Sequence, residues 1–400
     1  MVRIAFLLTQ SLEDPSGLGR YFPLAKELAR LGHELNVLAL HPNLSTLSQR
    51  RLEKEGVKVH YVGQMHVRKA GNYKTYFSTP GLLKAALSSS LRMSIRAFLS
   101  EADVMHLGKP HPINGVAALV GAKLLRRKPL YLDCDDHEAE SNRLSAPWQK
   151  RAFTLFEDNL PKFTKGLTVN TRFLIKRNVA LGYPKERIIY VPNGVDRDRF
   201  SRIDSKRVQK LRDSLDLEGK RVVLYIGSLS LATHPVGLLL EAFAIVSQRL
   251  KEAVLVLVGG GEDYDLICDR VGEMGLGHRV IVVGRAKPSL VPYYFKLGDV
   301  SVDPVYDDVV ARARCPLKVL ESMALGVPVV TGDVGDRREI LGQAGLLVAP
   351  GNGEALAAGI LSVLRDEDRG KAMAEAALET RERYYWDVLV KDFIRVYNDR

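Results

Sequence analysis

The sequence predicts an α/β protein with two doubly wound parallel-sheet domains, one in each half of the chain. Short apolar runs rich in β-branched residues alternate with segments of helical periodicity along the whole sequence, which is typical of βαβ units. The 400 residues exceed the size of one ordinary core, so two domains of roughly 150–200 residues each are expected. No low-complexity segment or short-period repeat interrupts the alternation.

In the first half, strands are expected where short apolar runs lie between turn signals. These runs are residues 4–9, 35–40, 57–61, 104–107, 130–134 and 166–170. Helical spacing of apolar residues predicts helices between them, and Gly32 ends the first of these helices. The expected helices are residues 21–31, 82–99, 114–125 and 147–160.

The second half repeats this pattern. Its expected strands are residues 222–227, 254–259, 280–284, 300–302 and 327–330, and its expected helices are 235–250, 290–297 and 316–326. The turn-rich segment 190–196 is the expected junction, so the predicted domains are residues 1–195 and 196–383. Residues 384–400 have helical spacing and large aromatics, and they form either a helix that packs back on the first domain or the last helix of the second.

Composition favours a cytoplasmic globular protein. Hydrophobic residues make up 46% of the chain and charged residues 26%, and no apolar run approaches the ~20 residues needed to span a bilayer. The N-terminus has the pattern of a first strand rather than of a signal peptide. The three cysteines fit no zinc or disulfide spacing, which favours a reducing compartment.

The net charge of +11 is concentrated in the first half of the chain. Residues 1–200 contain 31 lysines and arginines against 18 acids. A solvated basic surface is the plain interpretation; an anionic membrane surface or an anionic acceptor is the functional one. Nucleic acid is not an expected partner, because no aromatic-studded basic motif or helix-turn-helix pattern is present. The basic clusters are Arg50–Arg51, Arg68–Lys69, Arg92 with Arg96, Arg126–Lys128 and Lys150–Arg151.

The segment 316–330 predicts a loop, a helix and a buried strand that together suit a nucleotide diphosphate. Pro316 fits the first helical turn and Gly326 the helix end. Lys318 and Glu321 share one face near the helix N-terminus. Free N–H groups with a nearby lysine suit phosphate, and a carboxylate one turn further suits a ribose diol.

Glycines follow several predicted strands. Gly17 and Gly19 lie between the first strand and the first helix, where backbone can approach a ligand closely. This is not a dinucleotide fingerprint, since Phe22 stands three residues after Gly19. In the second half, Gly227 and Gly260 end strands at the edge where open sheets bind ligands.

Charged residues cluster at two further places. The first cluster lies at the end of the expected strand 130–134 and contains Asp133, Asp135, Asp136 and Glu138 beside His137. So many acids cannot all be buried without partners. A site role is therefore expected for them, whereas ordinary packed histidines are the preferred interpretation of His106 and His111. The second cluster consists of Arg312, Arg314 and Lys318, three cations at the start of the nucleotide helix that suit a leaving diphosphate.

Together these motifs resemble the GT-B glycosyltransferases of family 4. The resemblance is carried by the glycine pair at residues 17–19, the helix end at 31–35, the segment 191–196 and the segment 316–330. It implies two Rossmann-like domains facing a cleft, a nucleotide-diphosphate-sugar donor held by the second domain, and a hydroxyl acceptor contacted by the first. It also implies retention of anomeric configuration and no cofactor or metal.

The resemblance assigns roles residue by residue. Glu321 matches the acid that binds the donor ribose, and the N–H groups around Pro316, Leu317 and Lys318 match those that hold the diphosphate. Gly17 and Gly19 match the loop under the donor phosphate. The base would be clasped through the backbone of Arg285 and Ala286.

Three positions depart from the family pattern. Ala313 stands where a second glutamate contacts the donor sugar, Ser228 and about His234 stand where an Arg/Lys pair is usual, and Asp135 replaces a histidine. Our hypothesis is that Arg312, Arg314 and Lys318 supply the missing positive charge. Asp135 or Asp136 would orient the acceptor hydroxyl or stabilise the positive sugar.

Two kinds of alternative remain open. An epimerase or a phosphorylase would use the same two-domain plan, although the sequence shows neither an acid/base cluster against the sugar nor a cofactor lysine. A catalytically inert sugar-nucleotide-binding subunit is suggested by Ala313 and Ser228. The expected partners are the donor, a glycan or lipid-linked glycan acceptor, and an anionic membrane surface on the cytoplasmic side.

Overall fold

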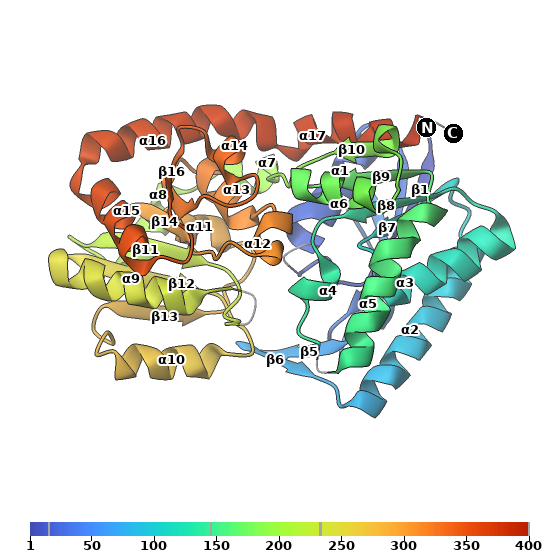
Figure 1. Cartoon of the computed structure of the whole chain (residues 1–400), viewed down its shortest axis with the longest axis horizontal. Coiled ribbons are helices and arrows are strands. Elements are labelled where there is room, and N and C mark those ends of the chain that lie inside the picture. Colours follow the sequence, from blue (N-terminus) through green and yellow to red (C-terminus); the bar gives the residue numbers. More distant parts are fainter. Residues whose placement is uncertain (15–16, 145, 232–233, 399–400) are drawn as a thin grey trace.

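The computed structural model describes residues 1–14, 17–144, 146–231 and 234–398, and it contains two α/β lobes (Figure 1). The first lobe is built on an eight-stranded sheet with the order β10-β9-β8-β7-β1-β2-β4-β3. All its neighbours run parallel except β3 and β4. Its strands are β1 (Arg3–Leu8), β2 (Glu34–His41), β3 (Arg51–Lys54), β4 (Val57–Gln64), β7 (Val104–Gly108), β8 (Leu130–Cys134), β9 (Gly166–Val169) and β10 (Ile188–Tyr190).

The second lobe is built on a six-stranded sheet with the order β13-β12-β11-β14-β15-β16, parallel throughout. Two buried clusters, one on each face, enclose it, because its strands are apolar on both sides. The strands are β11 (Arg221–Ile226), β12 (Ala253–Val258), β13 (Val280–Gly284), β14 (Val300–Asp303), β15 (Val329–Gly332) and β16 (Gly345–Val348).

Helices cover the faces of both sheets. Those of the first lobe are α1 (Phe22–Arg30), α2 (Thr79–Leu99), α3 (Pro112–Ala117), α4 (Glu138–Ser141), α5 (Pro147–Asn159) and α6 (Arg172–Ala180). Those of the second lobe are α7 (Arg197–Ser201), α8 (Ser205–Ser214), α9 (Val236–Arg249), α10 (Tyr264–Glu273), α11 (Val291–Phe295), α12 (Val309–Ala313), α13 (Leu317–Ala324), α14 (Arg337–Leu341), α15 (Gly353–Arg365) and α16 (Glu367–Thr380).

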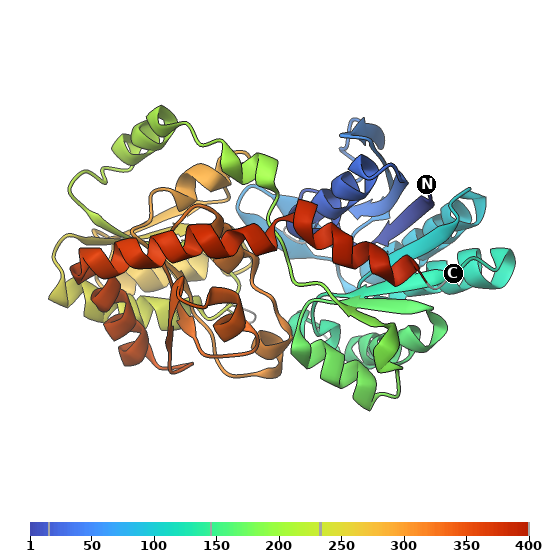
Figure 2. The same cartoon turned by 90° about the horizontal axis from the view of Figure 1, so that it is seen from above.

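The last helix, α17 (Trp386–Phe393), crosses from the second lobe back to the first (Figure 2). Its apolar face packs against β1 and α1, and Trp386 Nε1 donates to the carbonyl of Gly19 at 2.8 Å. Backbone bonds between Val195 and the residues on either side of Tyr385 hold the two crossing segments together. Residues 399 and 400, the end of the expected C-terminal helix, lie outside the described residues.

The predicted fold class is confirmed, with differences at particular elements. The last strand of the 316–330 unit is β15, Val329–Gly332, rather than 327–330, because Gly326 (φ 67°) and the residues around Pro328 form the turn that precedes it. The helix expected at 114–125 is a short α-helix followed by a π-helical segment, Ala118–Leu124.

Several elements were not predicted. They include the strands β3, β10 and β16, the helices α6, α8, α10, α15 and α16, and one hairpin. In this hairpin the strands β5 (Val67–Ala70) and β6 (Tyr73–Tyr76) pair antiparallel, apart from both main sheets, and Gly71 and Asn72 form its tip. The dipeptide Gly-Asn between two short β-prone runs is the signal that favours such a hairpin. Its largely polar, exposed strands lack the apolar alternation by which the other strands were found.

Candidate active site

The glycine pair expected in a loop lies in a π-helical segment, Gly17–Tyr21, that contacts the start of α13 where the two lobes meet. A Cβ atom at Gly19 would lie 2.5 Å from Leu317 Cδ1, so glycine permits this approach. A Cβ atom at Gly17 would lie 2.0 Å from the carbonyl oxygen of Ser11, so that position has no room for a side chain either. Pro316 is the residue just before the first helical turn, with φ −76° and ψ 113°, and α13 begins at Leu317. Pro15 and Ser16, which precede this glycine pair, lie outside the described residues.

Lys318 lies inside the second lobe beside an acid. Its Nζ atom is 3.0 Å from Asp303 Oδ1 and lies over the ring of Tyr225, 4.9 Å from the centroid. Burial lowers the pKa of Lys318, although Asp303 opposes the shift. Asp303 also accepts from Arg337 Nε at 2.9 Å, so the one carboxylate lies between two cations. Burial raises the pKa of Asp303, but these two cations outweigh it and keep that pKa well below its ordinary value.

Glu321 is partly buried on α13 and faces an arginine. Arg199 Nη1 of α7 lies 3.5 Å from Glu321 Oε1, and Arg199 also donates to the carbonyl of Pro288 at 3.0 Å. Burial raises the pKa of Glu321, while Arg199 and then Lys318 lower it. A ligand hydroxyl at Glu321 would therefore meet an acid that already has a cationic partner.

An ion pair between Arg314 of the second lobe and Asp136 of the first joins the two lobes. Arg314 Nη2 lies 3.6 Å from Asp136 Oδ2, joining the loop before α13 to the end of β8. The other oxygen of Asp136 accepts from Ser141 Oγ at 2.5 Å and from the N–H of His137 at 3.0 Å, which fixes the carboxylate. Burial raises the pKa of Asp136, but Arg314 leads the groups that lower it below its ordinary value.

The structure does not bring Arg312 to this pair. Its guanidinium is half exposed and bonds both oxygens of Asp307, at 2.7 and 2.9 Å. Ala313, next to it, is fully buried against the first lobe, where its carbonyl accepts from Thr171 at 3.5 Å. The expected group of three cations is therefore divided, with Arg314 and Lys318 inside and Arg312 at the surface.

Asp135 has a partner that the sequence did not suggest. Lys109, just after β7, places Nζ 3.1 Å from Asp135 Oδ1 and 2.9 Å from Glu138 Oε1. The backbone of Lys109 has φ 74°, an unusual conformation for a side-chain-bearing residue and one that is often found at functional sites. Burial raises the pKa of Asp135 to about 7, against the effect of Lys109.

Ser228 and His234 stand at the two positions where the resemblance led us to expect an arginine and a lysine. Ser228 follows Gly227 after β11, and its carbonyl accepts from the Tyr225 hydroxyl at 2.9 Å. A Cβ atom at Gly227 would lie 3.1 Å from Lys318 Cε. His234 lies in the same neighbourhood, and burial, followed by Arg314 and Lys318, holds its pKa well below the ordinary value.

The β5–β6 hairpin of the first lobe reaches the carboxyl edge of the second sheet (Figure 1). Asn72 Oδ1 accepts from the N–H of Arg285 at 2.8 Å, and the carbonyl of Asn72 accepts from the N–H of Gly261 at 2.9 Å. Arg285 Nε donates to the carbonyl of Gly71 at 2.9 Å. A Cβ atom at Gly260 would lie 2.5 Å from the Asn72 carbonyl oxygen. The hairpin tip thus occupies the N–H of Arg285, one of the backbone groups expected to hold a base, and Ala286 is partly buried against the core.

Two other features lie apart from this site. His106 is buried, with Nδ1 2.8 Å from the hydroxyl of Tyr397, and His111 accepts at Nδ1 from the N–H of Ile113 at 3.2 Å.

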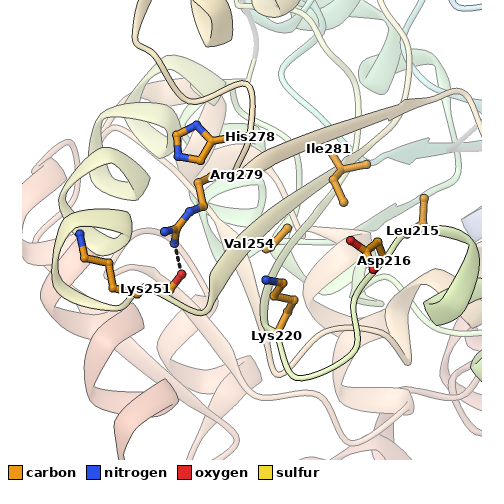
Figure 3. Close-up of a pocket in the computed structure, with 8 residues that line it drawn as sticks. All are labelled: Leu215, Asp216, Lys220, Lys251, Val254, His278, Arg279 and Ile281. Carbon is orange, nitrogen blue, oxygen red and sulfur yellow. Dashed lines mark hydrogen bonds between the residues drawn. The ribbon is translucent and has the colours of Figure 1, made fainter.

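A cavity of about 420 Å³ lies at the amino ends of β11, β12 and β13, the opposite edge of the sheet from the glycines (Figure 3). Arg279 donates there to the carbonyl of Lys251.

Sequence reasoning missed several charged residues of the site. Lys109 follows a predicted strand at the ligand edge and could have been found by that rule. Asp303 ends a predicted strand in the same way and could have been found by the same rule. Arg337 and Arg199 carry no local signal, because only the fold brings them to α13. Within the described residues, no group of three or more His, Cys, Asp or Glu side chains is placed to hold a metal ion. In the same part of the chain no helix is both long and apolar enough to cross a bilayer.

Comparisons with known proteins agree with this architecture. A family model described as a glycosyl transferase 4-like domain matches residues 16–194, and one described as glycosyl transferases group 1 matches residues 207–380. An uncharacterised glycosyltransferase of Methanocaldococcus jannaschii is 29% identical over 223 residues, which cover 54% of this chain and 54% of that protein.

A GDP-mannose-dependent alpha-(1-6)-phosphatidylinositol monomannoside mannosyltransferase of Mycobacterium tuberculosis is 29% identical over 220 residues, which cover 53% of this chain and 57% of that protein. The chain thus spans about half the length of these curated relatives.

Solved structures match the fold over the whole chain. Sucrose-phosphate synthase from Thermosynechococcus elongatus matches with a TM-score of 0.77 at 17% identity, covering 100% of this chain and 99% of that one. Anabaena HepE, solved in complex with UDP-glucose, matches with a TM-score of 0.75 at 19% identity, covering 100% of both chains. Two α/β domains with parallel sheets, as in these structures, make up the GT-B fold. The chain belongs to the GT-B glycosyltransferases of family 4 type.

Proposed function

We propose that this protein transfers a sugar from a nucleotide-diphosphate-sugar to a hydroxyl acceptor, with retention of anomeric configuration and without a metal or other cofactor. The observation that carries the proposal is the approach of Arg314 to Asp136 at 3.6 Å, beside the contact of Gly19 with Leu317. A cation and a helix N-terminus from one domain thus lie beside acids from the other. The names of a GDP-mannose-dependent relative and of a UDP-glucose complex support a donor of this class.

The diphosphate would lie at the start of α13. The first N–H groups of a helix have no partners within it, and they favour an anion together with the helix dipole. Arg314 and Lys318 add charge at the same end of the helix. Fixed cations and N–H dipoles stabilise the charge that develops on the leaving diphosphate as the bond from the anomeric carbon breaks.

The acceptor would approach from the first domain. Asp135 and Asp136 follow β8, at the edge that faces α13, and either one can accept a hydrogen bond from a hydroxyl or face a positively charged sugar. The hydroxyl oxygen attacks the anomeric carbon on the face that the diphosphate leaves, which retains the configuration. We assign no covalent nucleophile.

The direct test is donor turnover. We expect purified protein, treated with EDTA and given a panel of UDP-, GDP- and ADP-sugars, to release nucleoside diphosphate slowly from one of them, and faster once a suitable acceptor is added. An inert binding subunit would bind a nucleotide but release none, and an epimerase would convert the sugar without releasing diphosphate; either result would refute transfer.

The pH dependence of transfer tests the role of Asp135. Because burial raises the pKa of Asp135 to about 7, its carboxylate is protonated below that pH and cannot accept a hydroxyl proton. We expect kcat/KM to rise with pH through about 7 and then level off, and Asp135→Asn to lose both rate and this dependence. Glu157, whose pKa burial also raises to about 7, is the matched comparison. If Glu157→Gln rather than Asp135→Asn removed the pH dependence, the assignment would be wrong.

The hairpin tip makes a prediction about donor affinity. Since Asn72 bonds the N–H of Arg285, a base at this position must displace it. Asn72→Ala should lower the Kd for the preferred nucleoside diphosphate by roughly 2–10-fold, the equivalent of one hydrogen bond. Calorimetric titration with UDP, GDP and ADP would measure this, with Thr75→Ala on the same hairpin as control. Weaker binding by Asn72→Ala would instead mean that Asn72 contacts the bound nucleotide favourably.

We further propose a cytoplasmic location with an acceptor presented at an anionic membrane surface, such as a lipid-linked glycan. The excess of basic residues in the first, acceptor-side domain supports this location, since basic segments are attracted to anionic lipids.

A further inference from the structure

Helix α2 leaves one long apolar side without a cover. Its opposite side is buried through Ser89, Met93 and Ala97, spaced four residues apart. The outer side carries large apolar residues at similar spacing, and Leu87 and Leu91 are 71% and 63% exposed. The helix lies at the outer edge of the first lobe (Figure 1). The exposed residues are Leu83, Leu87, Leu91, Ile95, Phe98 and Leu99.

The neighbouring π-helical segment extends this surface. A Cβ atom at Gly121 would lie 2.3 Å from the carbonyl oxygen of Ser94, which shows how closely the segment lies against α2. Leu124 is 73% exposed, and Leu125 and Val120 are exposed beside it. We call these residues and the six on α2 the outer apolar face. Contiguous exposed apolar surface of this kind on a soluble domain marks an interaction site.

The charges of the stretch that forms the outer apolar face are mostly basic. Residues 56–132 contain twelve lysines and arginines and only two acids, Glu101 and Asp103. Both acids pair with Arg3, at 3.7 and 2.8 Å. Arg126 lies over the ring of Phe98, 5.1 Å from its centroid, so a cation and an exposed aromatic stand side by side.

We infer that the outer apolar face docks the protein on an anionic lipid bilayer. An amphipathic helix with apolar residues on one side and mainly basic charges around it lies in the interface plane, where the leucines enter the acyl boundary and the cations meet phosphate headgroups. A protein partner of neutral or basic surface does not fit, because unbalanced positive charge surrounds the apolar centre. The inference refines the membrane location proposed above.

Flotation with vesicles tests the face. We expect the full chain to float with vesicles of phosphatidylcholine containing phosphatidylglycerol, to float much less with phosphatidylcholine alone, and to dissociate in part at high salt, since screening shortens the range of the charges. The double variant Leu87→Ser, Leu91→Ser should bind at least tenfold more weakly. Neither side chain belongs to the core, so the fold should persist, as circular dichroism would check.

Matched variants separate the two contributions. Arg92→Gln with Arg126→Gln and Arg127→Gln should abolish the preference for phosphatidylglycerol. Leu266→Ser, equally apolar and 54% exposed on α10 of the second lobe, should leave flotation unchanged. Flotation of the leucine variant at the level of the unaltered protein would overturn the inference. So would a protein that binds no vesicles and forms a dimer that these leucines hold together.

The flotation result does not depend on whether the protein transfers a sugar. Release of nucleoside diphosphate from a water-soluble donor should be equal for the leucine variant and the unaltered protein, because the outer apolar face lies outside the site around α13. If the leucine variant loses flotation but keeps turnover, the result concerns the outer apolar face alone. If the unaltered protein floats but has no turnover, only the proposed transfer reaction is refuted.

Discussion

Replacement of Arg314 by alanine is expected to lower kcat by about 10²–10³-fold, the effect of losing one fixed charge from a site that stabilises a developing anion. Arg314 extends from the loop before α13 to Asp136, 3.6 Å away across the domain junction. Lys318→Ala should have an effect of the same order. Initial rates of nucleoside diphosphate release at saturating donor would measure both.

The control for this prediction is another arginine of the second domain. Arg338 is 71% exposed and pairs with Asp333 at the surface, so Arg338→Ala should keep full activity. Arg312→Ala should cost less than Arg314→Ala, because Asp307 holds Arg312 at the surface. Equal rates for Arg314→Ala and the unaltered protein would refute the proposed charge stabilisation.

The largest stability effect is expected at Arg20, where Arg20→Ala should cost about 3–5 kcal/mol because it leaves the buried carboxylate of Asp133 without its cation. Arg20 and Asp133 are both fully buried and joined by two hydrogen bonds of 2.6 and 2.7 Å. The same guanidinium donates to the carbonyls of Val191 and Pro192 and to Asn193, all in the segment that leads into the second domain. Burial would raise the pKa of Asp133, but Arg20 keeps it below its ordinary value.

Urea unfolding followed by circular dichroism would measure this cost, with Arg395→Ala as comparison. Arg395 is 62% exposed and pairs with Asp392 on the helix surface, where an ion pair contributes about 0.5 kcal/mol or less. Equal midpoints for Arg20→Ala and Arg395→Ala would contradict the prediction. Because Arg20 follows the glycine loop directly, the same variant should also weaken donor turnover.

Local signals explain what could be predicted of this molecule. The helix before Gly326 and the alternation of apolar strands with helices depend on residues close in sequence, so the fold class and α13 were foreseeable. The pairing of Arg314 with Asp136 was not, since the two lie in different domains and only the packing of the sheets brings them together. For the same reason, Arg312 and Arg314 looked equivalent in the sequence, yet one side chain turns outward to Asp307.

In the proposed binding mode, in which a base bonds the N–H of Arg285, the hairpin tip is a tethered competitor for the nucleotide of the second domain. Asn72 is connected to the first domain by the short strands β5 and β6, so it meets the N–H groups of Gly261 and Arg285 at an effective concentration on the order of millimolar. A nucleotide that binds these N–H groups must displace Asn72. When the nucleotide dissociates, Asn72 bonds the same groups again at once. Exchange at this edge can therefore be fast even when the contacts themselves are strong.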